Sequence, residues 1–320
     1  MTSAAGRFDD VPLQKLRPSA VYLNARRYGM CRPRALACAD TWKHIFNTCF
    51  TQRVAGQFYK LSSVRLVGFP DAFPKGRLFV SAHFSAYTFV SIALALHYKK
   101  RIHIVVGTPP KAFEDYLVDS LAEAGVAATI IRSDFSQLRN IRRAVDAGEP
   151  VVSLIDVPWH RTVIRDRQYD YFKLGAGEIQ ASRSIFKIAD RLDLMPTLVL
   201  CVPNGDAFDI VYHGHLSQQA SFDILADLIE RHPGHFERFC EMHMYYRGGR
   251  PCNDLTTFLI GAHRYVAVAT HQRYWKLGAA ATRHIEDQLC LDDGRSAASA
   301  TIKHLVRQLT SLDHDEVVYF

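Results

Sequence analysis

The sequence lacks several features that would place it in a specialised class of protein. No apolar run approaches the roughly 20 residues that a membrane-spanning helix needs, and the first ten residues contain no apolar segment typical of a secretory signal. The seven cysteines are odd in number and scattered, so their spacing does not suggest a disulfide framework. We therefore expect reduced thiols and a cytoplasmic protein, with peripheral contact to the inner membrane as an alternative.

Motifs for common cofactors are also missing. The chain has no phosphate-binding loop, no dinucleotide fingerprint and no Gly-x-Ser-x-Gly nucleophile elbow. His232, His235, Cys240 and His243 resemble a metal site only superficially, because their spacing matches no standard zinc pattern. The net charge of +7 suits an acidic carrier protein or an anionic lipid, but no nucleic-acid-binding motif is present. We expect no metal, no cofactor and no nucleic-acid partner.

The centre of the chain contains an alternation of β-prone and helical segments. The expected strands span residues 78–80, 102–106, 128–131, 151–155 and 197–202, and the expected helices span 86–98, 111–124, 135–147 and 178–191. Such alternation is typical of βαβ units built around a parallel sheet. The sequence therefore predicts an α/β fold in which helices flank a mixed, mostly parallel sheet.

The two ends of the chain differ from this centre. Residues 1–20 look irregular, the apolar spacing from 21 to 66 is helical, and residues 217–247 are expected to be helical before a Gly- and Pro-containing boundary at 247–251. We predict an N-terminal helical lead (1–66), an α/β core (67–247) and a small C-terminal appendage (252–320). The appendage is expected to contain a β-like stretch at 265–269, a helix to about residue 291 and a final helix over roughly 297–310.

His83 and Asp156 are the main candidates for chemistry, because each follows a predicted strand. The carboxyl ends of parallel strands form the edge at which open α/β sheets bind ligands, so the two side chains could meet there. A histidine can abstract a proton near neutral pH, and Asp156 could orient it or bind an acceptor amine. Two alternatives stay open: a hydrogen-bonded core histidine, and an aspartate that caps the turn after its strand.

A resemblance to a known family begins at the first of these residues. The block His83-Phe84-Ser85-Ala86-Tyr87-Thr88 resembles the first block of the lysophospholipid acyltransferase superfamily. The most similar branch is that of the bacterial lipid A biosynthesis (lauroyl/myristoyl) acyltransferases, whose block is typically His-Phe-Gly-Asn-Trp-Glu. Further similar segments follow in the same order at 138–156, 171–175, 188–203 and 232–243, so that the resemblance covers roughly residues 70–247.

This resemblance implies a glycerolipid-acyltransferase-like core and an acyl transfer reaction. His83 would be the general base that deprotonates a hydroxyl or amine acceptor for attack on a thioester of acyl-carrier protein or CoA. The family pairs this histidine with an acidic residue where this chain has Thr88, so we expect Asp156 or Thr88 to orient the imidazole. Substrate contacts are implied for the other residues of two blocks, namely Phe84, Ser85, Tyr87, Phe172, Lys173 and Gly175.

Two departures from the branch change the expected substrate. Gly107-Thr108-Pro109 stands where the branch tends to have Tyr-Arg-Pro, and the usual N-terminal membrane span is not visible. We therefore expect a relative that acylates a small-molecule, carrier-bound or lipid acceptor, as in a secondary-metabolite pathway, rather than lipid A. The alternatives are a thioester hydrolase or cyclase on the same scaffold and a catalytically silent acyl- or peptide-binding protein. The last agrees with a resemblance of the appendage, at Tyr274-Trp275-Lys276-Leu277, to winged-helix peptide-binding domains.

Overall fold

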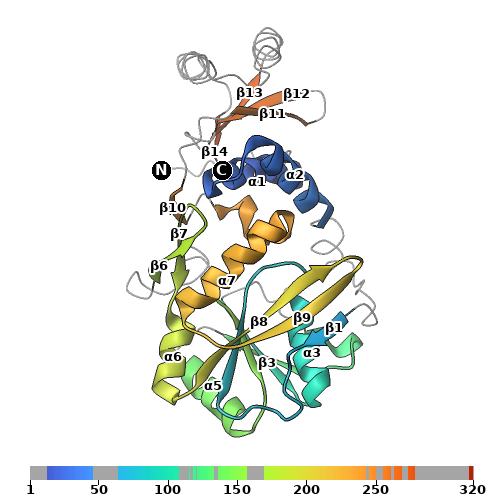
Figure 1. The fold of residues 1–320 in the computed structure, drawn as a ribbon, viewed down its shortest axis with the longest axis vertical. Coiled ribbons are helices and arrows are strands. Elements are labelled where there is room, and N and C mark those ends of the chain that lie inside the picture. The colour runs from blue at the N-terminus through green and yellow to red at the C-terminus, as the bar shows by residue number, and fades with distance from the viewer. Residues whose placement is uncertain are drawn as a thin grey trace. The chain divides into compact units, whose positions relative to one another are not determined.

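The computed structural model of the chain (Figure 1) describes most of the residues between 13 and 249. The described ranges are 13–45, 64–107, 121–132, 136–156, 169–242 and 245–249, with residues 115, 118 and 119, and the backbone of the strands at 255–260, 263–268, 273–277 and 317–319. The chain divides into two compact units. The larger comprises Thr41–Arg238 and Tyr245–Arg247, and the smaller comprises Met1–Asp40, Phe239–Met244 and Gly248–Phe320.

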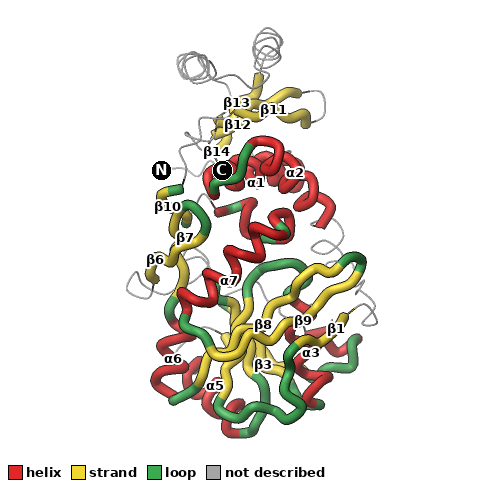
Figure 2. The backbone as a smooth tube through the Cα atoms, in the orientation of Figure 1, coloured by secondary structure: helices red, strands yellow, loops and turns green. Residues whose placement is uncertain are grey.

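A seven-stranded sheet forms the centre of the larger unit (Figure 2). In spatial order its strands are β1 (Val64–Val67), β9 (Ala207–His215), β8 (Met195–Asn204), β2 (Arg77–Ser81), β5 (Val151–Leu154), β3 (Ile102–Val106) and β4 (Ala128–Arg132). Every neighbouring pair is parallel except β8 and β9, which form an antiparallel hairpin. The prediction of an α/β fold with a mixed, mostly parallel sheet is confirmed.

The central position of β2 explains its sequence. Leu78, Phe79 and Val80 are all at most 1% exposed, and β2 lies inside the sheet between β8 and β5. A strand that is buried on both faces has a continuous apolar run rather than an alternating one. The following helix α3 (Thr88–Tyr98) is apolar along nearly its whole length and packs into the same core.

The remaining elements of the larger unit lie around this sheet. They include α5 (Gln137–Asp146), α6 (Ser184–Leu192), α7 (Gln218–Arg231) and the 3₁₀ helices η6 (Pro233–His235) and η7 (Glu237–Cys240), the last of which continues into the smaller unit. The hairpin of β6 (Tyr169–Leu174) and β7 (Gly177–Ser182) pairs with β10 (Tyr246–Gly248) in a second, three-stranded sheet. Among the described residues, no helix combines the length and apolar character needed to cross a membrane.

The smaller unit combines segments from both ends of the chain. It contains α1 (Leu13–Tyr28), the first part of α2 (Arg32–Ile45) and a four-stranded antiparallel sheet. The strands of this sheet are β11 (Leu255–Ile260), β12 (His263–Val268), β13 (Arg273–Leu277) and β14 (Val317–Tyr319). Asn24 on α1 donates a hydrogen bond to the backbone oxygen of Phe239 at 2.6 Å, and the Tyr28 ring lies edge-on to the Phe239 ring.

Several elements differ from those expected. Residues 178–182 lie in strand β7 rather than in a helix, and their alternating burial is the period-two pattern of a half-buried strand. Residues 64–66 and 246–247 are also in strands, because each segment pairs with a distant strand of its sheet. Helix α1 begins at Leu13, inside the stretch expected to be irregular. The expected helix at 111–124 lies mostly outside the described residues, and the helical segments expected after residue 277 lie wholly outside them.

Candidate active site

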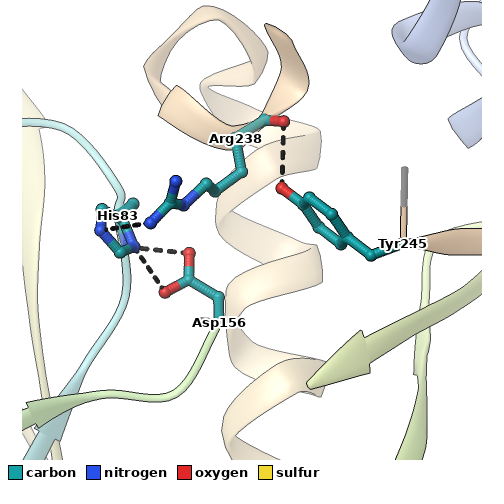
Figure 3. A network of polar contacts seen from close by, with 4 residues as sticks. All are labelled: His83, Asp156, Arg238 and Tyr245. Carbon is teal, nitrogen blue, oxygen red and sulfur yellow. Dashed lines mark hydrogen bonds and ion pairs between the residues drawn. The ribbon is translucent and has the colours of Figure 1, made fainter. Parts of the chain in front are cut away.

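The sheet brings His83 and Asp156 together at one edge. Strands β2 and β5 are adjacent and parallel, with Ser81 opposite Leu154, so the chain leaves both strands at the same level. His83 and Asp156 each lie two residues further on. The backbone N–H of His83 donates to Oδ2 of Asp156 at 3.0 Å, and Nδ1 of His83 lies 2.8 Å from Oδ1 (Figure 3). The expected meeting of these two residues is therefore present in the structure.

The carboxyl group of Asp156 is buried and ionised. Its residue is only 1% exposed, and burial by itself would raise its pKa. The interactions with His83 and with the positive charge of Arg238 more than offset this effect, so the pKa of Asp156 lies below its usual value. An ionised carboxylate at this position can orient the imidazole and stabilise the imidazolium that forms when His83 takes up a proton.

Arg238 completes the cluster, and no step of the sequence reasoning identified it. Its Nη2 atom lies 2.7 Å from Nε2 of His83, and its side chain is nearly buried. A guanidinium is always protonated in proteins and can only donate, so Nε2 of His83 must accept this hydrogen bond. The proton of the neutral imidazole is therefore on Nδ1, where it is donated to Asp156.

The segment that carries Arg238 is joined to the chain around His83 by backbone contacts. Ser85 N–H donates to the oxygen of His235 at 2.7 Å, Glu237 N–H donates to the oxygen of His83 at 3.0 Å, and Phe84 and Phe236 form a β-bridge between them. These contacts hold η6 and η7 against residues 83–85, which follow the end of β2. They explain why His83 is only 6% exposed although it follows the end of a strand.

Side chains from other parts of the larger unit hold the backbone on either side of Arg238. The indole Nε1 of Trp42 donates to the oxygen of Glu237 at 3.2 Å, and the hydroxyl of Tyr245 donates to the oxygen of Arg238 at 3.3 Å (Figure 3). Gly234 packs so closely on α2 that a Cβ atom there would lie 2.5 Å from Cγ2 of Thr41. The position of Arg238 is thus determined by contacts between residues far apart in the sequence.

The other residues of the block 83–88 differ in their burial and in their contacts with His83. The ring of Tyr87 lies edge-on to the imidazole, with centroids 4.7 Å apart, whereas Phe84 is completely buried. Thr88 is the first residue of α3, and the contacts of the described residues include no hydrogen bond between it and His83. Of the two partners expected for the imidazole, Asp156 makes the contact and Thr88 does not.

Phe172, Lys173 and Gly175 lie on the β6–β7 hairpin, and the first two contact α7. The Phe172 ring stacks on Phe222 with centroids 5.1 Å apart, and the backbone of Lys173 exchanges two hydrogen bonds with the side chain of Gln219. Gly175 adopts a φ of 60° in the turn of the hairpin, a conformation that glycine adopts readily. The contacts of Phe172 and Lys173 described here are with α7 and not with His83, and the role of the three residues in substrate binding stays a prediction.

The histidines between residues 232 and 243 do not form a metal site in the described part of the chain. No group of three or more His, Cys, Asp or Glu side chains among the described residues is arranged to hold a metal ion. The rings of His232 and His235 have their centroids 6.0 Å apart, and His235 instead contacts the hydroxyl of Ser85 through Nδ1 at 3.3 Å. His243 lies outside the described residues.

His235 makes the stability of this region sensitive to mild acid. Burial, together with the nearby His232, lowers the pKa of His235 from 6.5 to about 4. Between these values the unfolded chain binds more protons than the folded one, so the free energy of unfolding decreases as the pH falls through this window. The contribution is complete above pH 6.5, is lost by about pH 4 and is on the order of 3 kcal/mol.

We expect a His235→Gln substitution to flatten this pH dependence. Urea unfolding at about pH 7 and about pH 4.5 would measure the loss of stability in both proteins. His44→Gln, at an exposed position of α2, is the matched control and should retain the wild-type loss. Equal losses in His235→Gln and wild type would contradict the assignment of the effect to His235.

Fold and site together define an α/β protein with a buried His–Asp–Arg cluster at the carboxyl-terminal edge of a mostly parallel sheet. No protein-family model matches the chain, and no curated protein matches it significantly. The functional interpretation therefore depends on the geometry of the cluster and on the resemblance in the sequence.

Proposed function

We propose that this protein is an acyltransferase that moves an acyl group from a thioester to a hydroxyl or amine acceptor. The observation that carries the proposal is the hydrogen bond between Nδ1 of His83 and the ionised carboxylate of Asp156. This bond places the proton of the neutral imidazole on Nδ1 and leaves the lone pair on Nε2. The pair thus has the orientation and the charge of a general base with its supporting carboxylate.

The reaction would proceed by proton transfer and acyl transfer. Nε2 of His83 takes the proton of the acceptor as its oxygen or nitrogen attacks the thioester carbonyl carbon. The resulting tetrahedral intermediate collapses by breaking the carbon–sulfur bond, and the imidazolium returns its proton to the leaving thiolate. Asp156 stabilises the imidazolium in both steps, and a base of this kind contributes about 10²- to 10⁴-fold to the rate. Arg238 has to leave Nε2 before the acceptor can bind there.

The backbone of the first block supports the proposed relationship to the lipid A acyltransferase branch. Ser85 has a φ of 54°, in the left-handed region that favours glycine. The typical block of the lipid A acyltransferase branch, His-Phe-Gly-Asn-Trp-Glu, has glycine at the corresponding position. Asp156, which comes from the next strand of the sheet, can supply the carboxylate that the block of this chain lacks at Thr88.

The proposal is tested by intact-mass analysis after incubation with acyl-carrier and acyl-CoA thioesters and candidate acceptors. We expect transfer by the wild type and a decrease of about 10²- to 10⁴-fold in His83→Ala, because the base is removed. His44→Ala, at an exposed histidine of α2, is the matched control and should retain wild-type rates. Thioester consumption without modification of an acceptor would instead identify a hydrolase, and an internally acylated product would identify a cyclase.

A catalytically silent binding protein is the second candidate, and the contact between Arg238 and His83 favours it. The atom that would accept the proton is occupied by a guanidinium in the structure. If the protein only binds acyl groups, calorimetry should give the same affinity for an acyl thioester in wild type and His83→Ala, with no turnover in either. Turnover that depends on His83 would exclude this candidate.

A further inference from the structure

We propose that the exposed side of helix α5 is a docking surface for an acidic carrier protein that presents the acyl thioester. The side chains that form this surface are Arg139, Arg142 and Arg143, which we call the arginine surface. The inference deepens the proposed acyl transfer and rests on it for the identity of the partner as the donor. It assigns the donor to a carrier protein rather than to CoA.

The arginine surface lies on the side of α5 that faces away from the sheet. The helix packs on β4 and β5 through its apolar side, where Ile141 is fully buried and Ala144 is 2% exposed. The three arginines are all exposed. They are therefore accessible to a partner without any change in the fold.

Two of the three arginines have no partner in the described part of the chain. Nε of Arg142 donates to the carboxylate of Asp146 at 2.9 Å, whereas Arg139 and Arg143 form no hydrogen bond or ion pair with another described residue. Three arginines and one aspartate give α5 a net charge of +2. Because a guanidinium binds a carboxylate through paired, charge-assisted hydrogen bonds, this surface suits the acidic side chains of a protein.

The charges of α5 are not placed to stabilise the helix. Arg139 lies in the first turn and Asp146 is the last residue, although the helix dipole favours the opposite sign of charge at each of these positions. Arg139 and Arg143 are four residues apart, a spacing at which like charges repel each other on a helix surface. Local stability therefore does not explain this arrangement, and an anionic partner would relieve the repulsion.

The arginine surface begins close to the edge of the sheet that holds the candidate site. Strands β4 and β5 are both parallel to β3, so the chain leaves β4 at the edge where Asp156 follows β5. Helix α5 begins at Gln137, soon after the end of β4, and its first turn with Arg139 lies toward that edge. A carrier protein bound to α5 would thus hold its thioester near the edge that carries His83.

The extent of the positive charge favours a protein over a lipid bilayer. Arg139 and Arg143 are about 6 Å apart along the helix axis, which matches neighbouring acidic side chains on one helix of a partner. On α6, the next helix along the chain, Lys187 and Arg191 are accompanied by Asp190 and Asp193. The positive charge therefore does not extend over the broad basic surface that binds anionic headgroups.

The test measures the binding of a bacterial acyl-carrier protein, in its holo form, to the full-length protein by titration calorimetry. We expect binding that weakens as sodium chloride is added, because exposed charges attract each other across the interface. Arg139→Glu should raise the Kd about tenfold, since the new carboxylate repels the carrier and pairs with Arg143 on the same helix. Binding of acyl-CoA, measured in the same way, should not change in this variant.

Thermal unfolding distinguishes a docking role of Arg139 from a structural one. Glutamate in the first turn is favoured by the helix dipole, and it stands four residues before Arg143 in the stabilising order of charges. We therefore expect Arg139→Glu to have a Tm equal to or above that of the wild type while it binds the carrier more weakly. A lower Tm together with weaker binding would indicate damage to the helix and would contradict the assignment.

Arg101→Glu is the matched control. Arg101 is exposed and directly precedes β3, at the opposite edge of the sheet from the candidate site, so its substitution changes the net charge equally but away from α5. This variant should bind the carrier like the wild type. Equal weakening by both substitutions would reduce the effect to net charge and would overturn the docking surface.

Failure of this inference can be separated from failure of the proposed function. Absence of carrier binding, or binding that Arg139→Glu leaves unchanged, overturns the inference even if acyl groups are transferred from acyl-CoA. Binding to vesicles of phosphatidylglycerol and phosphatidylcholine that Arg139→Glu abolishes, without binding of the carrier, would overturn it in favour of a membrane-binding surface. If the carrier docks on α5 but no acceptor is acylated, the docking surface stands and the acyltransferase assignment falls.

Discussion

Replacement of Asp156 by asparagine is expected to lower the free energy of unfolding by about 3 kcal/mol, because it removes a charged acceptor of two buried hydrogen bonds. The new side chain has nearly the same size, so packing is preserved and the change is electrostatic. An amide has only one oxygen acceptor for the two donors of His83, and its NH₂ group would face one of them. Arg238 also loses the charge that acts on it.

The same substitution should change the tautomer of His83. An amide NH₂ facing Nδ1 favours a proton on Nε2, and that proton would then point at the guanidinium of Arg238. A base with its proton on the wrong nitrogen cannot accept one from the substrate. Under the proposed mechanism we therefore expect acyl transfer to fall by about 10⁴-fold.

Urea unfolding followed by circular dichroism would measure the stability change, with the exposed turn residue substitution Asp206→Asn as the matched control. The pKa of Asp156 is lowered in the folded protein, so its contribution is complete above the unfolded pKa and is lost as the pH falls below it. The difference between Asp156→Asn and wild type should thus shrink below about pH 4. A loss in Asp156→Asn no larger than in Asp206→Asn would contradict the role given to this carboxylate.

Replacement of Gly234 by alanine is expected to destabilise the larger unit by about 3 kcal/mol through overpacking. The added Cβ would lie 2.5 Å from Cγ2 of Thr41 and 2.9 Å from the backbone nitrogen of Trp42. The backbone nitrogen cannot move without distorting α2, so η6 must move instead. That displacement would weaken the hydrogen bond from Ser85 to His235 and would shift Arg238 relative to His83.

The matched control for this prediction is Gly205→Ala in the turn between β8 and β9. A Cβ there meets nothing within 4 Å, but the φ of +59° is unfavourable for alanine, so we expect a loss of about 1 kcal/mol. Chemical unfolding of both variants separates crowding from backbone strain. If Gly234→Ala is as stable as Gly205→Ala, the close approach of η6 to α2 does not limit this position.

The elements predicted best were those whose burial determines their pattern. Strand β2 (Arg77–Ser81) contains the continuous apolar run Leu78–Val80, which is buried, and its position was predicted closely for this reason. Strand β7 was missed because its alternating residues are partly polar and also fit a helical spacing. Its strand conformation depends on pairing with β6, a tertiary contact that composition does not report.

The residues of the candidate site also differ in whether the sequence could predict them. His83 and Asp156 could be inferred, because each ends a strand and parallel strands end at a common edge. Arg238 could not, since it lies 155 residues from His83 and no pattern in the sequence distinguishes it from the other basic residues of the chain. The nearest signal was that Arg238 lies within residues 232–243, one of the segments that carry the resemblance.

The sequence by itself determined the fold class and the two residues delivered to the edge of the sheet, because these follow from local hydrophobic patterns and from the position of a residue after its strand. The tertiary structure alone decided that β5 lies next to β2, which brings the carboxylate of Asp156 to His83. It also decided that η7 returns over the end of β2 and places Arg238 on Nε2. Such contacts depend on the packing of residues far apart in the chain, and no local pattern encodes them.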